Sequence, residues 1–547
     1  MKRTINLLLL LIIIGSSLFA QDKPIKNVIL MIPDGTSLSA VSAARWYQRY
    51  NNPELPNLHL DPYLCGTVLT YSSNAPIGDS APTTACYMTG YPSRAGWIST
   101  YPIPDPKNDI IPMDPAMSYQ PLMTVLEAAR LTQGKSTGLV FTCEFPHATP
   151  ADCAAHSYDR GKYEWIVPQM VHNQLDVVIG GGTSLLKDEH QAYLTQKGYG
   201  VFKDDITSFK NYQGNKMWAL FGHNDMRYDI DRDPSKEPSL AEMTQTAIAK
   251  LSTNENGFFL MVEGSKIDWA AHANDAVAII TDMLAFDKAC GVALDFAKGN
   301  GETVVVILSD HGNSGISIGS NKCGGYGNLT KDDLFANISK FKTSCDGLIS
   351  RLHDTDPDQL RDVVYELTGI SLTDDEYTQL LQSSDYNRST LTNDERMKGS
   401  RLTRIVAKIL DNHTCFGFTT GGHTGEEVLL AVYDPTPSRL MGHRTNIEVN
   451  HYLRQSLGLE TSLEALTGEY FAKHTDVFDG YSYAIQTEEG IPVLEVKNKK
   501  IKLEIRPNTN IIKHNGKEVE LNSVVIYVDK NNTFYLPQSL KGVISGK

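Results

Sequence analysis

The 547-residue chain has eight cysteines but no Cys-x-x-Cys pair. Zinc sites of the finger and ribbon type are usually built on such pairs, so this class of site is disfavoured. The chain also lacks an excess of positive charge, because its formal net charge is −14. Proteins that bind nucleic acid present a basic face to the phosphate backbone. The composition therefore argues against a nucleic-acid partner, although bound metal ions could still attract small anionic substrates.

No stretch after residue 20 is apolar and long enough to predict a membrane anchor. Residues 1–20 themselves combine Lys2 and Arg3, an apolar stretch at 7–14, and small residues before Gln21. This order is typical of a secretory signal peptide. No cysteine lies near its end, since the first is Cys65, so a lipid anchor is disfavoured. We predict an exported protein, periplasmic or secreted.

Export would place the cysteines in an oxidising compartment, where disulfides form. Eight cysteines allow 105 pairings, and the sequence does not choose among them. The nearest candidates along the chain are Cys143 with Cys153, and Cys323 with Cys345.

Three continuously apolar runs, at 27–33, 257–262 and 303–309, each end in an acidic residue. The first delivers Asp34, the second Glu263, and the third Asp310 followed by His311. Such runs predict strands that are buried on both faces, as in a parallel sheet. Ligands of open parallel sheets bind outside the carboxyl ends of the strands. We therefore expect these residues to converge on one rim, where their mutual repulsion calls for metal ions.

The fold class predicted is α/β, with a central, mostly parallel sheet flanked by helices. Further strands are expected at 136–141, 175–179 and 428–433, with helical patterns between them. One such helix, at 239–251, opens with a capping box of Ser239 and Glu242. This large catalytic domain would span residues 21–485.

Two additions interrupt or follow this pattern. At about 324–410 the strand signal gives way to polar helical stretches at 331–342, 357–367 and 374–381, which predict an insertion over the carboxyl-end rim. Residues 486–547 predict a small antiparallel β appendage, with an Asn515-Gly516 hairpin turn. Its many lysines favour a solvated strand face, with a surface or polymer contact as the alternative.

Two histidines and an aspartate suggest a metal site near the rim. Asp268 and His272 are four residues apart on a predicted helix, which places them on one face. Such a pair is usually a surface pair, but Glu263 lies just upstream. His423 lies in a glycine-rich loop at 420–427, where a histidine is more often a turn residue. Together the three would form a site with one open position, the pattern of catalytic zinc.

Ser80 is the candidate nucleophile. It lies in the sequence Asp79-Ser80-Ala81-Pro82, which is also an ordinary start of a helix. A serine at a helix N-terminus faces the positive end of the helix dipole, where anions bind. The chain has no GxSxG elbow. A metal-activated serine therefore fits better than a Ser-His-Asp triad.

These segments, in combination and in order, resemble the metal-dependent alkaline phosphatases that use a serine nucleophile. The resemblance runs from about residue 25 to the loop at 420–427, with the insertion set aside. It implies hydrolysis of phosphate monoesters to alcohol and inorganic phosphate through a phosphoserine, with two Zn²⁺ and one Mg²⁺. The resemblance implies that Ser80 is the phosphorylated nucleophile and that Arg160 clamps the phosphate. It implies that the first zinc is held by Asp268, His272 and His423, and the second by Asp310 and His311. Asp34 would bridge the second zinc to magnesium, whose shell Glu263 and Thr149 would complete.

Two departures from the family pattern affect what can be carried over. His147 occupies a position where some bacterial members have aspartate and animal members have histidine, so the identity of the third metal is open. The insertion is longer than in the simplest bacterial members. A homodimer is compatible with the resemblance, but its contacts cannot be transferred.

The sequence leaves three alternatives open. A sulfatase shares the strand-end metal architecture, but Thr84 stands where its C/S-x-P-x-R motif has arginine. A phosphodiesterase of the same superfamily would use similar chemistry, although Arg160 favours monoesters. A secreted binding protein with structural metals is the third alternative, and the open coordination position argues against it.

Overall fold

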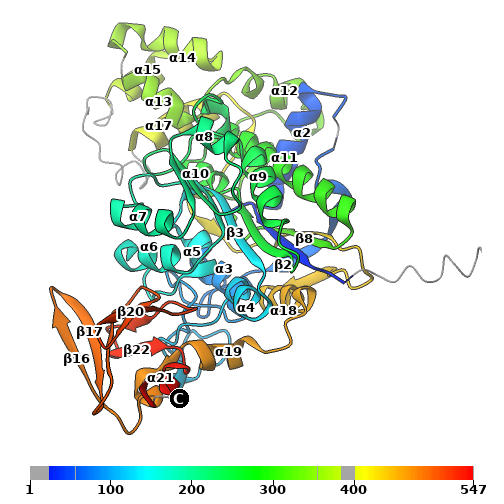
Figure 1. The fold of residues 1–547 in the computed structure, drawn as a ribbon. Helices are drawn as coiled ribbons and strands as arrows, with labels where there is room; N and C mark the ends of the chain where they lie inside the picture. Colours follow the sequence, from blue (N-terminus) through cyan, green and yellow to red (C-terminus); the bar gives the residue numbers. More distant parts are fainter. Residues whose placement is uncertain (1–23, 56, 354, 383–400, 546–547) are drawn as a thin grey trace, which may run out of the picture.

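Figure 1 shows the computed structural model of the protein, which describes residues 24–547 except 56, 354, 383–400 and 546–547. The predicted signal peptide lies outside the described residues. A ten-stranded sheet forms the centre of the molecule. In spatial order its strands are β14 (Gly442–Thr445), β2 (Leu64–Leu69), β13 (Val428–Tyr433), β8 (Thr303–Leu308), β1 (Asn27–Ile32), β7 (Phe258–Glu263), β3 (Ser136–Glu144), β4 (Val177–Gly181), β6 (Met217–Phe221) and β5 (Gly200–Lys203).

The sheet is mostly parallel, as the sequence predicts. From β8 to β5 every neighbouring pair runs in the same direction, whereas β13 runs against both of its neighbours. The register aligns the strand ends: Ile32 of β1 pairs with Glu263 of β7, and Met31 pairs with Ile307 of β8. The residues that follow these positions must therefore leave the sheet at the same edge.

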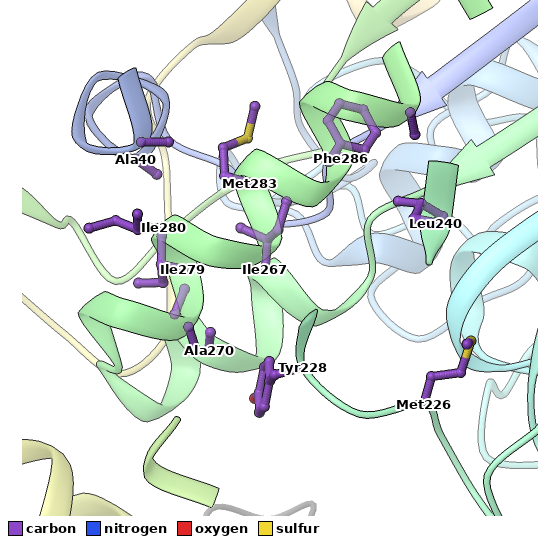
Figure 2. Close-up of a cluster of buried hydrophobic side chains, with 14 of the residues drawn as sticks. Ala40, Met226, Tyr228, Leu240, Ile267, Ala270, Ile279, Ile280, Met283 and Phe286 are labelled. Carbon is purple, nitrogen blue, oxygen red and sulfur yellow. The ribbon is translucent and has the colours of Figure 1, made fainter. Parts of the chain in front are cut away.

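Both faces of the sheet are buried, which explains the continuously apolar runs. Along β1, Ile29 and Met31 enter one hydrophobic core, while Val28, Leu30 and Ile32 enter the other. Figure 2 shows part of the first core, to which Ala40, Leu240, Ile267 and Met283 contribute from four different helices. The helices on this side are α2 (Leu38–Asn51), α8 (Ile206–Asn211), α9 (Leu240–Leu251), α10 (Lys266–Ala273) and α11 (Ala276–Asn300). The other core contains residues of α3 (Ser80–Thr89), α4 (Val125–Gln133), α5 (Ala148–Ala154), α6 (Tyr163–His172), α7 (Asp188–Gln196), α18 (Asn446–Leu457) and α19 (Leu463–Tyr470).

The predicted insertion is helical and packs against the first core. Its helices are α12 (Lys331–Phe335), α13 (Cys345–His353), α14 (Leu360–Thr368), α15 (Asp374–Leu381) and α17 (Arg401–Asn412). They gather at one end of the molecule in Figure 1, and α17 contacts α10. Short strands that the sequence does not reveal anchor the insertion: β10 (Ser317–Ile318) pairs with β11 (Phe416–Gly417), and β9 (Gly312–Asn313) pairs with β12 (His423–Thr424).

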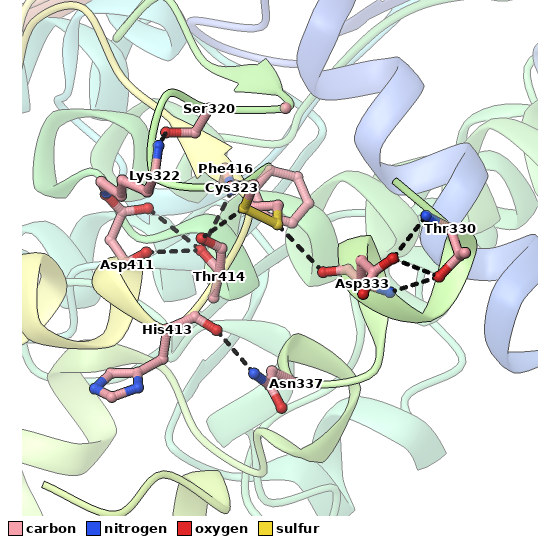
Figure 3. Close-up of a disulfide and its surroundings, with 12 residues drawn as sticks. Ser320, Lys322, Cys323, Thr330, Asp333, Asn337, Asp411, His413, Thr414 and Phe416 are labelled. Carbon is pink, nitrogen blue, oxygen red and sulfur yellow. Dashed lines mark hydrogen bonds and ion pairs between the residues drawn. A yellow bond between two sulfur atoms is a disulfide. The ribbon is translucent and has the colours of Figure 1, made fainter. Parts of the chain in front are cut away.

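A disulfide between Cys323 and Cys415 closes the insertion at its base (Figure 3). Both candidate pairs considered from the sequence are wrong, because Cys143, Cys153 and Cys345 are free. The reason is that the two ends of the insertion return to the same place through the β10–β11 pair. This brings together cysteines that are 92 residues apart.

The C-terminal region forms an antiparallel sheet of five strands, β16 (Ser482–Glu488), β17 (Ile491–Lys497), β18 (Lys502–Ile505), β19 (Ile511–His514) and β20 (Lys517–Glu520). It starts slightly before the predicted boundary at 486. The hairpin at Asn515 and Gly516 is confirmed, with positive φ at both residues. A second small sheet joins β15 (Ala472–Lys473), β22 (Thr533–Leu536) and β21 (Ile526–Val528), with α20 (His474–Val477) and α21 (Leu540–Ser545) beside it. Among the described residues, no helix is long and apolar enough to cross a membrane.

Candidate active site

The strand-end residues predicted from the sequence do meet at one edge of the sheet. Asp34, Glu263 and Asp310 have no exposed surface, and His311 is 1% exposed. The backbone amide of Gly35 donates to the Asp310 carboxylate at 3.0 Å, which ties the ends of β1 and β8 together. Carboxylates that are brought together without water need positive charge nearby.

Asp268, His272 and His423 form a cluster that we call the first site. Asp268 and His272 project from α10, and the Nε2 atoms of His272 and His423 lie 3.4 and 3.6 Å from the Asp268 carboxylate. The two Nε2 atoms lie 3.1 Å from each other. Because the His272 side chain is 41% exposed, this site opens to solvent.

The hydrogen bonds of His272 and His423 define which ring nitrogen of each can bind a metal ion. The Nδ1 atom of His272 contacts the carbonyl of Gly421 at 2.9 Å, and that of His423 contacts the carbonyl of Gly78 at 2.9 Å. A carbonyl only accepts, so each Nδ1 carries the proton and each Nε2 presents a lone pair. Two lone pairs that face each other beside a carboxylate match the donor set of a divalent cation.

Asp34, Asp310 and His311 form the second site. The Nε2 atom of His311 lies 3.5 Å from Asp34 Oδ1 and 3.4 Å from Asp310 Oδ2. Its Nδ1 contacts the carbonyl of Gly312 at 3.1 Å, so here too Nε2 is the unprotonated nitrogen. Asp34 and His311 also lie close enough to Asp268 to share a cation with it. The two sites are therefore contiguous.

Ser80 lies beside the second site as the first residue of α3. Asp79 is the actual N-cap, since its carboxylate accepts from the Ala81 amide at 2.8 Å. The Ser80 hydroxyl is thereby left for other contacts. Its Oγ lies 3.3 Å from His311 Nε2 and 3.5 Å from Asp34 Oδ1. The serine is only 2% exposed.

Arg160 reaches the same region from the turn before α6. Its Nη1 lies 3.5 Å from Asp79 Oδ1, and its Nη2 donates to His147 Nε2 at 2.8 Å. The backbone amide of Arg160 donates to the carbonyl of Gly96 at 2.7 Å. Burial opposes the charge of Arg160, but Asp79 raises the pKa of the guanidinium above its ordinary value. The arginine is charged and 30% exposed, and its contact with Asp79 places it beside Ser80.

A third site lies at the ends of β3 and β7, where Cys143, His147 and Glu263 each offer one donor atom within 4.8 Å of the others. His147 caps α5, and Thr149 follows in its first turn. Several of the polar atoms here are buried without a hydrogen-bond partner among the described residues: Asp34 Oδ2, Glu263 Oε1, His147 Nδ1 and Thr149 Oγ1. Thr149, which the sequence predicts as a metal ligand, is thus buried with an unpaired hydroxyl. Orphaned oxygens of this kind fit bound cations.

The electrostatics of the metal-free protein lead to the same conclusion. Burial, followed by repulsion from Asp310 and other carboxylates, raises the pKa of Asp34 well above its ordinary value. Burial and Asp310 likewise raise the pKa of Glu263 to about 8. Burial opposes ionisation of Asp268 as well, yet His272, His423 and His311 together lower its pKa. The carboxylates cannot all ionise at neutral pH unless cations are present.

Three contributing residues are not among those predicted from the sequence. Asn313 donates to Asp268 Oδ1 at 2.7 Å, and its place two residues after His311 was the available signal. Gly35 adopts φ +60°, and a Cβ atom there would lie 2.3 Å from Asp268 Oδ1. The sequence makes Cys143 a candidate only for a disulfide, because nothing in it shows that Cys143 faces Glu263.

Comparison with known proteins decides the family. The sequence matches the family model described as "Alkaline phosphatase" over residues 25–459. The chain belongs to the alkaline phosphatase family. Alkaline phosphatase 3 of Bacillus subtilis is 32% identical over 441 residues, covering 78% of this chain and 88% of that protein. The repressible alkaline phosphatase of Saccharomyces cerevisiae is 28% identical over 524 residues, covering 85% and 86%.

Solved alkaline phosphatases share the fold. A cold-active alkaline phosphatase from Shewanella sp. superposes with a TM-score of 0.67 at 27% identity, covering 79% of this chain and 99% of that one. The Thermus thermophilus alkaline phosphatase gives a TM-score of 0.69 at 23% identity, covering 80% and 93%, and supports the fold alone. The chain is therefore an enzyme of a metal-dependent phosphomonoesterase family.

Proposed function

We propose that this alkaline phosphatase hydrolyses phosphate monoesters in two steps, with Ser80 as the nucleophile. The observation that supports this most directly is the position of the Ser80 hydroxyl, 3.3 Å from His311 Nε2 and 3.5 Å from Asp34 Oδ1. The Arg160 guanidinium is linked to the same helix start through Asp79. This closeness supports a role for Ser80 as nucleophile, for the clustered acids and histidines as metal ligands, and for Arg160 as the phosphate-binding cation.

The residues present fit two zinc positions. Asp268, His272 and His423 would hold one zinc ion, since their donors converge and one side is open to solvent. Asp34, Asp310 and His311 would hold the other, beside Ser80. When bound, such ions stabilise the negative charge of the entering and leaving oxygens of the phosphoryl group.

The chain's own groups then account for the remaining chemistry. The Arg160 guanidinium would turn from His147 towards the phosphate and bind two of its oxygens through its planar fork. The Ser80 oxygen would form a bond to phosphorus while the ester bond breaks and the alcohol leaves with a proton. Water would then attack the phosphoserine, which releases inorganic phosphate and restores the hydroxyl. The dipole of α3 favours negative charge on Ser80 throughout.

We also propose that the protein is exported, as the first twenty residues indicate. The Cys323–Cys415 disulfide supports this, since disulfides persist in oxidising compartments. Fractionation of cells that express the full chain, with the mature N-terminus sequenced, would test it. An uncleaved protein in the cytoplasm would contradict the proposal.

The function is tested by assaying purified protein on an aryl phosphate monoester, a diester and a sulfate, before and after chelation. We expect chelator-sensitive activity that is greatest on the monoester. Ser80→Ala should abolish turnover while the bound metal is retained, whereas Ser252→Ala, at the exposed end of α9, should change nothing. Full activity of Ser80→Ala would exclude the covalent mechanism. Activity on sulfate without metal would exclude the proposed class.

A further inference from the structure

Cys143 lies among residues that resemble a metal site more than a hydrophobic core. It is the penultimate residue of β3, and β3 is the parallel neighbour of β7, with Val140 paired to Val262. This pairing brings Cys143 next to Glu263 at the end of β7. Its Sγ lies 3.6 Å from Glu263 Oε2. Neither side chain has exposed surface.

The second observation is that the polar partners of Cys143 are buried and incompletely satisfied. Glu263 Oε1 has no hydrogen-bond partner among the described residues. A nitrogen of His147, the Cys143 sulfur and a Glu263 oxygen all lie within 4.8 Å of one another. The His147 ring also packs edge-on against Trp269, with centroids 5.7 Å apart, which limits its movement. These three groups are therefore held around one small space. A cation bound by His147 would displace the hydrogen bond that His147 Nε2 accepts from Arg160.

The chemistry of this donor set differs from what magnesium prefers. Mg²⁺ takes oxygen ligands in octahedral geometry and usually keeps several waters. Thiolate and imidazole donors instead select zinc and other softer divalent cations. Thr149 and Asp34 also have buried, unpaired oxygens. A magnesium ion would nevertheless leave the Cys143 sulfur and the His147 imidazole without a role as ligands.

We propose that Cys143 is a metal ligand at the third site, and that this site binds zinc in preference to magnesium. The proposal rests on the proposed function only in that both require this edge of the sheet to bind divalent cations. On binding, the Cys143 thiol would give up its proton to solvent and the sulfur would bond to the cation. Burial raises the pKa of the free thiol, so the thiolate would persist only while the metal is bound.

Cobalt substitution tests the sulfur ligand directly. The full-length protein is stripped with a chelator and reloaded with Co²⁺, and its near-ultraviolet spectrum is recorded. A sulfur-to-cobalt charge-transfer band is expected in the wild type and should be absent in Cys143→Ser. Cys290→Ser is the matched control, because Cys290 is equally buried but lies on α11, outside all three sites. It should retain the band.

Metal competition tests the preference. Metal-free protein is equilibrated with equal concentrations of Zn²⁺ and Mg²⁺, and the bound metals are counted by atomic emission. The wild type should carry zinc without magnesium, and Cys143→Ser should lose at least about tenfold in zinc preference at one position. The inference is wrong if the cobalt-loaded wild type lacks the charge-transfer band. It is also wrong if the wild type binds magnesium at one position although zinc is present at equal concentration. Retained phosphatase activity would then show that the proposed function survives, whereas protein that binds no metal would contradict both.

Discussion

The hydroxyl of Tyr158 donates a hydrogen bond to the Asp529 carboxylate at 2.6 Å. This contact joins the turn between β21 and β22 to the segment that bears Arg160, two residues further on. A second contact reaches the following helix, α6, since the buried Gln169 donates to Asn508 at 3.0 Å. The C-terminal region, which lies beyond the matched family segment of 25–459, thus contacts both the segment that bears Arg160 and the helix that follows it.

Removal of the Tyr158 hydroxyl should weaken substrate binding more than turnover. Tyr158→Phe deletes one exposed hydrogen bond, worth about 0.5–1.5 kcal/mol, which corresponds to a rise in KM of roughly two- to tenfold. We expect kcat to change less, because Ser80 and the metal-ligand residues are untouched. Steady-state kinetics on an aryl phosphate would measure this split. The control is Tyr365→Phe, an exposed tyrosine of the insertion, and a KM equal to that of the wild type in both variants would contradict the prediction.

The Cys323–Cys415 disulfide should stabilise the insertion. Its loss, in Cys323→Ser/Cys415→Ser, frees a loop of 92 residues in the unfolded state, and closing long loops typically contributes about 2–4 kcal/mol. Urea unfolding should show a lower midpoint for the double variant. Cys65→Ser, which removes a free cysteine on β2, should not shift it. An unchanged midpoint in the double variant would show that the β10–β11 pair is sufficient.

Uptake of metal should release protons, and metal removal should make stability depend on pH. In the metal-free protein the pKa of Glu263 is about 8, against an ordinary value of 4.5. The folded chain then holds a proton that the unfolded chain has released. The stability from this group is complete below pH 4.5 and is lost as the pH rises through 8. Asp34, whose pKa is also raised, acts in the same direction.

We therefore expect the melting temperature of chelated protein to fall as the pH rises from about 5 to about 8, and that of the metal-loaded protein to fall less. Calorimetry in buffers of different ionisation enthalpy should detect the released protons. Glu263→Gln is the informative variant, since it cannot titrate. If its metal-free form shows the same slope as the wild type, Glu263 is not the responsible group.

The strand ends could be predicted from the sequence because their cause is local. A continuously apolar run followed by Asp34, or by Asp310 and His311, already specifies a buried parallel strand and the edge at which its last residue emerges. The helix spacing of Asp268 and His272 is equally local. By contrast, the partners of these residues depend on long-range register: Asn313 reaches Asp268 across 45 residues, and its place two residues after His311 does not identify that partner.

The errors have the same physical origin. The pairing of Cys323 with Cys415 requires the insertion to return to its starting point, which the two-residue strands β10 and β11 achieve. Strands of that length have no readable periodicity. The contact of Cys143 with Glu263 likewise follows from the order of strands in the sheet, and Asp529 reaches Tyr158 across 371 residues.

Gly35 should be intolerant of any side chain. Its φ of +60° costs an L-residue about 1–2 kcal/mol, and a Cβ atom there would also lie 2.3 Å from Asp268 Oδ1. Gly35→Ala would therefore displace the carboxylate that links the first and second sites. We expect loss of bound zinc and of activity well beyond the backbone cost. Gly198→Ala is the matched control, since Gly198 has φ +83° but nothing within 4 Å of its Cβ position. Gly198→Ala should lose stability by about 1–2 kcal/mol and keep its metal. Equal metal content in the two variants would contradict the prediction, because it would show that Asp268 can move aside without loss of metal binding.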